Sequence, residues 1–134
     1  MEDVYELFIR GTALLAAGHF HQATVPLERA RRLSPESASI REALGRALFQ
    51  AQRYSEAADE FRALVERSPT NDFALFCLGR SLQMLGRHAE ARQPLALAAC
   101  LQPERRDYQT YRDRARSAAA RTAPAVDADE QTVE

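Results

Sequence analysis

Apolar residues recur along the chain at steps of three and four, which is the spacing of one face of an α-helix. One such stripe runs from Leu75 to Leu82, and a second runs from Ala91 to Leu101. A turn is indicated between them at Leu85-Gly86-Arg87. Pro103 ends the second stripe, because proline lacks the backbone N–H that a helix needs and restricts the residue before it. The pattern predicts a pair of helices joined by a short turn.

The same pair of stripes occurs three times, with a period of 34 residues. A glycine lies in each first stripe, which predicts a place where another backbone comes close. Pro26 and Pro94 lie about six residues into their second helices, so we expect these helices to start late or to bend slightly. The positions that align after a shift of one period are Gly11, Gly45 and Gly79; Leu14, Leu48 and Leu82; Ala23, Ala57 and Ala91; Leu27, Phe61 and Leu95; and Pro35, Pro69 and Pro103.

This period and these aligned residues resemble the tetratricopeptide repeat (TPR) family, whose unit is a helix–turn–helix of 34 residues. The resemblance implies an all-α fold, an α-solenoid of seven helices. Arg10 departs from the pattern, since Leu44 and Leu78 hold the equivalent places, but the first unit has no neighbour on its outer side. The expected parts are an N-terminal lead (1–3), three repeats (4–37, 38–71 and 72–105), a capping helix (106–121) and a disordered acidic tail (122–134).

The capping helix is expected to cover the end of the stack with one face, formed by Tyr108, Tyr111 and Ala115. Charge changes along the chain at this point. Residues 1–103 hold 12 arginines and 12 acidic residues, residues 104–121 hold six arginines and three acidic residues, and the tail holds four acidic residues and no base. Lysine is absent, which excludes lysine-based catalysis.

Composition excludes several classes of site. Cys77 and Cys100 have no close-spaced partner of the kind found in zinc or redox motifs, so we interpret them as small apolar residues in a reducing compartment. The chain has no run of ~20 apolar residues, and its start, MEDVYELF, lacks the basic beginning of a secretory signal. We therefore expect a cytoplasmic protein without a membrane segment.

Candidate catalytic and metal-binding chemistry is sparse. His19 and His21 flank Phe20 in the first turn, but a closed zinc site usually needs four ligands, so no metal is expected. The chain has no glycine-rich phosphate loop, nucleophile elbow or HExxH spacing. We expect neither an enzyme nor a cofactor.

The resemblance implies that the first helix of each unit lines an inner groove in which partners bind. One subgroup of the family grips the terminal carboxylate of a peptide with lysine, asparagine and arginine. Here the matching places hold Phe8, Thr12, Ala43, Phe73 and Cys77, so this carboxylate clamp is missing. The candidate groove residues, which follow steps of three and four on the second face of these helices, are Tyr5, Phe8, Ile9, Thr12, Glu42, Ala43, Arg46, Phe73, Phe76, Cys77 and Arg80.

The sequence thus predicts a non-enzymatic adaptor that binds an extended or helical peptide segment of another protein. One alternative is a self-associating scaffold that buries the groove in a homodimer. An alternative of another class is a nucleic-acid contact through the arginine-rich last helix, although acidic residues dilute its charge. A third hypothesis is that the acidic tail folds back over this helix. The arginines concerned are Arg105, Arg106, Arg112, Arg114, Arg116 and Arg121.

Overall fold

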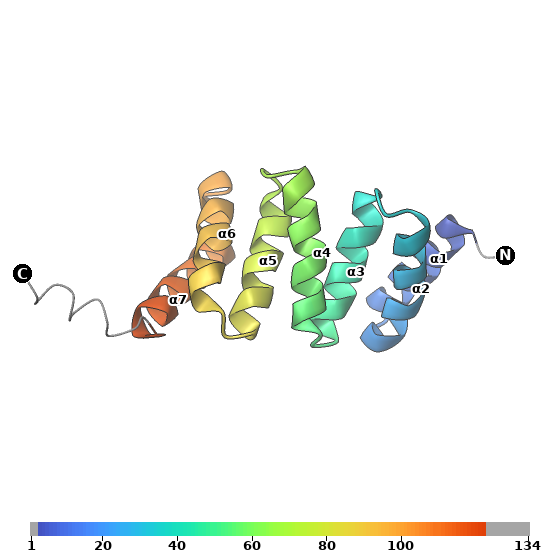
Figure 1. Cartoon of the computed structure of the whole chain (residues 1–134), viewed down its shortest axis with the longest axis horizontal. Helices are drawn as coiled ribbons and strands as arrows, with labels where there is room; N and C mark the ends of the chain where they lie inside the picture. Colours follow the sequence, from blue (N-terminus) through green and yellow to red (C-terminus); the bar gives the residue numbers. More distant parts are fainter. Residues whose placement is uncertain (1–2, 123–134) are drawn as a thin grey trace, which may run out of the picture.

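The computed structural model describes residues 3–122, and these residues form seven α-helices and no strand. The helices are α1 (Val4–Ala16), α2 (Phe20–Leu33), α3 (Ala38–Gln50), α4 (Tyr54–Arg67), α5 (Asp72–Met84), α6 (His88–Leu101) and α7 (Arg106–Thr122). They stack side by side into an elongated array, with α7 at one end (Figure 1). The predicted α-solenoid is confirmed. The predicted disordered tail lies outside the described residues, except for Thr122, which belongs to α7.

The first helices of the three pairs begin 34 residues apart, at Val4, Ala38 and Asp72. The residue before each start has a short polar side chain that accepts a hydrogen bond from a backbone N–H of the first turn. These residues are Asp3, Ser37 and Asn71, and the bonds measure 3.3, 3.3 and 3.1 Å. A side chain of this type at the N-cap satisfies a donor that the helix itself leaves unpaired. The period of the sequence therefore appears as a repeated start signal.

The second helices do not start late at their prolines. Pro26 and Pro94 lie inside α2 and α6, and both are buried. Each proline removes one helical hydrogen bond, but its ring packs in the interior, where apolar burial offsets part of that loss. At the equivalent place in α4, Glu60 is buried and forms ion pairs with Arg31 at 2.5 Å and Arg41 at 2.9 Å. Three neighbouring helices are thus joined by charges at this position.

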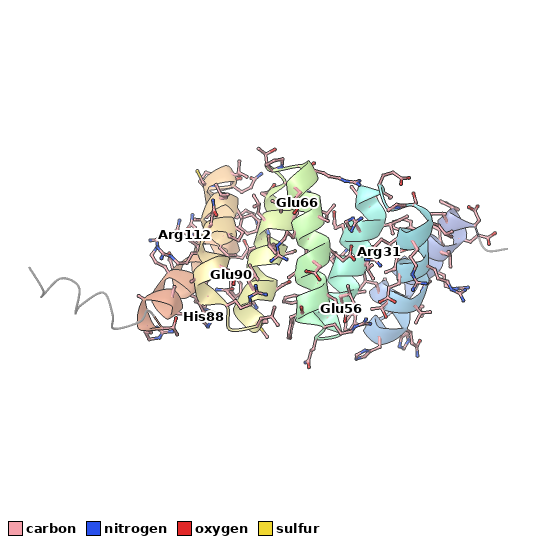
Figure 2. All side chains as sticks on the ribbon, viewed as in Figure 1. Arg31, Glu56, Glu66, His88, Glu90 and Arg112 are labelled. Atoms are coloured by element: carbon pink, nitrogen blue, oxygen red, sulfur yellow. The ribbon has the colours of Figure 1, made fainter. Side chains whose placement is uncertain are left out.

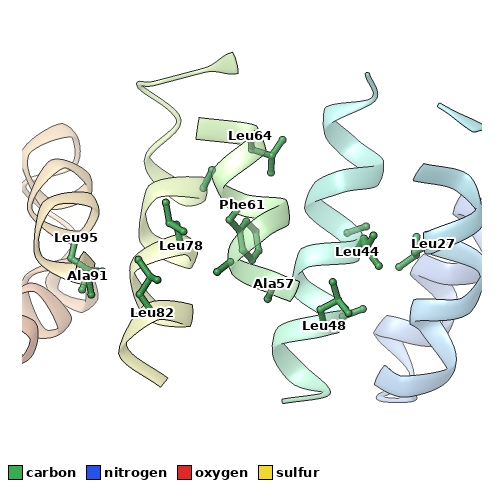
Figure 3. Packing of buried hydrophobic residues seen from close by; sticks show 14 of the residues in the cluster. Leu27, Leu44, Leu48, Ala57, Phe61, Leu64, Leu78, Leu82, Ala91 and Leu95 are labelled. Atoms are coloured by element: carbon green, nitrogen blue, oxygen red, sulfur yellow. The ribbon is translucent and has the colours of Figure 1, made fainter. Parts of the chain in front are cut away.

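The glycines of the first helices leave space that side chains of the second helices occupy. The predicted close approach of another backbone is therefore wrong. A Cβ atom added at Gly79 would lie 2.4 Å from Cγ of Leu95. Leu27 approaches Gly11 and Phe61 approaches Gly45 in the same way. The three approaching side chains are fully buried, and Figure 3 shows all three among the core residues. The absent side chain of each glycine lets the second helix place its central apolar residue against the first.

The turn between the helices of each pair contains one residue with a positive φ. Gly18 and Gly86 have φ angles of 84° and 76°, and Gln52 has 65° at the equivalent place. Glycine adopts this left-handed region without a steric penalty, whereas glutamine does not. The middle turn therefore has a strained residue where the other two do not.

The two ends of the solenoid are closed in different ways. At the C-terminal end α7 packs on α6, with Tyr108 and Ala115 fully buried, as predicted. The Tyr108 hydroxyl donates a hydrogen bond of 2.8 Å to Oδ2 of Asp72. At the N-terminal end the outer face of α1 exposes Glu6 and Arg10, so it is polar. No helix in the range 3–122 has both the length and the apolar character needed to cross a lipid bilayer.

Candidate functional site

A cavity of about 380 Å³ opens on the face formed by the first helices. This is within the usual size range of ligand pockets. We call it the groove pocket. Its lining residues are Thr12, Leu15 and Ala16 of α1, Phe20 of α2, Arg46, Phe49 and Gln50 of α3, Phe61 of α4, and Phe73, Phe76, Cys77 and Arg80 of α5.

Six of the candidate residues meet at this pocket. They are Thr12, Arg46, Phe73, Phe76, Cys77 and Arg80. The other five lie elsewhere: Ala43 is 5% exposed and belongs to the core, and Phe8 packs against the core. Glu42 is half-buried, and Tyr5 and Ile9 are 68% and 47% exposed on α1. The candidate set therefore divides into six pocket residues, two core positions, the half-buried Glu42 and two exposed apolar residues on α1.

Sequence reasoning missed part of the apolar lining. Leu15 and Phe49 come three residues after Thr12 and Arg46, so they lie on the same helix face, and this spacing could have identified them. Phe20 and Phe61 come from second helices, which were not expected to contribute. Phe61 reaches the pocket because Gly45 leaves room for its ring.

One wall of the pocket is attached to the capping helix. The ring of Phe76 stacks on that of Tyr108 with centroids 4.6 Å apart, and lies 5.7 Å from the ring of Tyr111. The guanidinium carbon of Arg80 lies 3.9 Å from the Tyr111 ring centroid, a cation–π distance. Arg80 also donates a hydrogen bond of 2.9 Å to Oε1 of Gln83. Phe76 and Arg80 thus pack internally as well as lining the pocket.

Two groups of the pocket, the Arg46 guanidinium and the Cys77 thiol, differ in their exposure and in their interactions with the rest of the protein. Arg46 is exposed and makes no hydrogen bond, ion pair or ring contact with any residue from 3 to 122. Burial, and to a smaller degree the charge of Glu42, raise the pKa of the Cys77 thiol to about 12. Cys77 is therefore a neutral thiol at physiological pH. The pocket combines an apolar lining with one uncommitted cation at its rim.

The histidines considered as metal ligands and the arginines considered for nucleic-acid contact lie at defined places in the structure. His19 precedes α2 and His21 lies in its first turn, and both are exposed. Residues 3–122 contain no cluster of three or more histidine, cysteine or acidic side chains able to hold a metal ion. Arg105, which directly precedes α7, pairs with Asp107 at 2.7 Å and also lies over the Tyr108 ring. The local acidic residues therefore neutralise part of the basic helix.

Two models of the tetratricopeptide repeat match the chain, over residues 10–72 and 60–93. Among curated proteins, Superkiller complex protein 3 of Mus musculus is 33% identical over 82 residues, and the Homo sapiens protein is 32% identical over 82 residues. Each match covers 61% of this chain but only 5% of the relative. The similarity is therefore to a small part of these long proteins.

Solved structures share most of the arrangement of helices. MamA of AMB-1 is 27% identical with a TM-score of 0.80, over 89% of this chain and 70% of that one. The first TPR of Spaghetti (RPAP3), bound to HSP90 peptide SRMEEVD, is 15% identical with a TM-score of 0.80, over 87% of this chain and 93% of that one. At this identity the second likeness concerns the fold alone. The repeats, their packing and the matching family models together show that the chain belongs to the tetratricopeptide repeat family.

Proposed function

We propose that the protein is an adaptor without enzymatic activity of its own, which holds an extended or helical peptide segment of a partner protein in the groove pocket. The observation that supports this most is the composition of the pocket. Phe20, Phe49 and Phe73 are partly exposed and offer apolar surface, and Arg46 offers a cation that makes no hydrogen bond or ion pair in the described part of the chain. Such a pocket suits a segment that has an apolar side chain and a nearby carboxylate.

Burial of the apolar side chain would supply most of the affinity. Each 100 Å² of apolar surface removed from water contributes about 2.5 kcal/mol, from which the ordering cost of the peptide is subtracted. Arg46 would then fix the orientation of the segment through a charge-assisted hydrogen bond. The Spaghetti (RPAP3) structure supports a peptide as the class of ligand, because that protein has a peptide bound on the same fold.

The proposed binding mode does not use a carboxylate clamp. Thr12, Phe73 and Cys77 line the pocket at three of the places where that clamp has its polar residues. Apolar contacts would therefore contribute more, and the terminal carboxylate of the partner less, than in a clamped complex. An internal segment of a partner would fit as well as a terminal one.

Selection from a library of random dodecapeptides tests the proposal directly. Enriched peptides should contain an apolar anchor and an acidic residue. Their affinity should fall at least tenfold for Arg46→Glu and for Ala16→Arg, which places a large side chain at the pocket rim. Ala13→Arg is the matched control, because Ala13 is exposed on α1 and does not line the pocket. Equal binding by all four proteins, or the absence of any enriched peptide, would reject the groove pocket as the site.

A self-associating scaffold is the second candidate, and the exposure of Tyr5 and Ile9 on α1 favours it. Burial of these side chains between two copies would stabilise a dimer. Light scattering over a concentration series distinguishes the candidates, since a monomer at high concentration excludes the dimer. For both candidates we propose a cytoplasmic location, supported by two cysteines that are free thiols in the structure.

A further inference from the structure

A notch of about 230 Å³ lies between α6 and α7 and shares no residue with the groove pocket. Three of its five lining residues are arginines, and none is acidic. The notch is formed by Arg92, Gln93 and Ala96 of α6 and by Arg112 and Arg116 of α7. Arg112 is labelled in Figure 2, at the side of α6. Two helices therefore direct three positive charges at one small space.

The arginines of the notch are poorly neutralised. Arg112 forms an ion pair of 3.0 Å with Asp113, whose side chain is 61% exposed. Arg92 and Arg116 are exposed and make no hydrogen bond or ion pair within residues 3–122. Like charges one helical turn apart, such as those of Arg112 and Arg116, repel each other. An oxyanion in the notch would remove this repulsion and accept charge-assisted hydrogen bonds from the guanidinium groups.

We propose that this arginine notch binds carboxylates of the segment that follows α7, residues 123–134. The segment has four acidic residues and no basic residue. Its charge is therefore opposite to that of the notch. It is also attached to the helix that supplies two of the three arginines, so binding needs no second molecule.

The attachment point allows this contact. Thr122 ends α7 six residues beyond Arg116, which is about 9 Å along a helix. Asp127 follows Thr122 by five residues, and five extended residues span about 17 Å. The acidic residues from Asp127 to Glu130 can therefore return to Arg116 without a change in α7. A short tether also gives the carboxylates an effective concentration on the order of millimolar at the notch, so that weak individual contacts suffice.

The test compares backbone amide NMR spectra of the full chain with those of a variant carrying Asp127→Asn, Asp129→Asn and Glu130→Gln. The variant keeps the length of the chain and removes three negative charges. Amide signals of the notch residues should shift, whereas signals of the groove pocket should not. The shift should shrink between about 0.1 M and 1 M salt, because the screening length falls from about 10 Å to 3 Å.

A matched pair of arginine variants identifies the contact. Arg116→Gln should abolish the spectral difference between acidic and neutralised tails. Arg32→Gln, an equal change of charge at an exposed position of α2, should leave it intact. Unshifted notch signals on tail neutralisation, or a difference that persists in Arg116→Gln, would overturn the proposal. A notch that responds to added inorganic phosphate but not to the tail would also overturn it, in favour of a phosphate-bearing ligand.

Discussion

The tight packing of Leu95 against Gly79 can be tested by the addition of one methyl group at Gly79. The new Cβ would lie 2.4 Å from Cγ and 2.6 Å from Cδ2 of Leu95. Cγ is the branch point of the side chain, so the whole isobutyl group must shift. Leu95 is 0% exposed, so no solvent-filled space is available to receive it. The substitution therefore sets helix propensity against packing.

The two effects differ in sign and size. Alanine favours a helix interior over glycine by about 1 kcal/mol, whereas forcing extra carbon into a filled core costs about 1–3 kcal/mol. Gly79→Ala should thus lower the free energy of unfolding by up to about 2 kcal/mol. The sign should reverse once the neighbouring side chain is shortened. Leu95→Ala itself lowers the free energy of unfolding by about 2–5 kcal/mol. In that background Gly79→Ala should raise the free energy of unfolding by about 1 kcal/mol, because the methyl group enters the vacated space.

Urea denaturation followed by far-UV circular dichroism measures all four proteins of this double-mutant cycle. The expected coupling energy between the two positions is about 1–3 kcal/mol, within the range for residues in contact. Ala13→Gly, at an exposed position of α1, calibrates the propensity difference in the same protein. If Gly79→Ala stabilised both backgrounds by the same amount, the proposed contact between glycine and leucine would be refuted.

Three further predictions concern other positions. Gln52 has a φ of 65°, so Gln52→Gly should raise the free energy of unfolding by about 0.5–1 kcal/mol, whereas Gln93→Gly inside α6 should lower it by about 1 kcal/mol; denaturation curves with equal effects at both positions would contradict this. Burial, and then the hydrogen bond to a carboxylate of α5, raise the pKa of Tyr108, so its stabilising contribution is complete below the unfolded pKa of about 10 and is lost as the pH rises above it. The chain has no lysine, so lysine titration does not contribute to a loss of stability at alkaline pH. The Tm of Tyr108→Phe should therefore fall less steeply with rising pH than the Tm of the wild type. An unchanged slope would exclude this role of Tyr108. Burial raises the pKa of Cys77 to about 12, so a thiol reagent at neutral pH should modify the exposed Cys100 first; a fast phase that survives Cys100→Ser would count against it.

The helix pairs could be predicted because their local signals recur at fixed positions. Asp3, Ser37 and Asn71 each begin a first helix with the same type of hydrogen bond. The packed face of α7 was predictable from spacing within one helix, since the separation of Tyr108 and Ala115 puts both on one side of it. Local chemistry and periodicity determine these features without reference to the rest of the fold.

The lining of the groove pocket could be predicted only in part, because it depends on how helices pack. Phe61 reaches the pocket from α4 through the space left at Gly45, and no spacing within a single helix shows this. Phe76 is partly covered by Tyr108, which depends on the position that α7 takes against α5. The late start expected of α2 at Pro26 was wrong for a related reason, because the burial of the ring offsets part of the loss of one hydrogen bond.

The Arg80 side chain joins the groove pocket to the end of the solenoid, and this creates a thermodynamic linkage. Its guanidinium group borders the pocket and rests on the Tyr111 ring of α7. If the carboxylate of a bound peptide draws this group away from Tyr111, the protein loses a cation–π contact worth about 0.5–1 kcal/mol. By thermodynamic reciprocity, weaker packing of α7 should raise the affinity for such a peptide by the same factor by which the peptide weakens that packing. The last helix would therefore lower the affinity for acidic ligands slightly, in addition to covering the core.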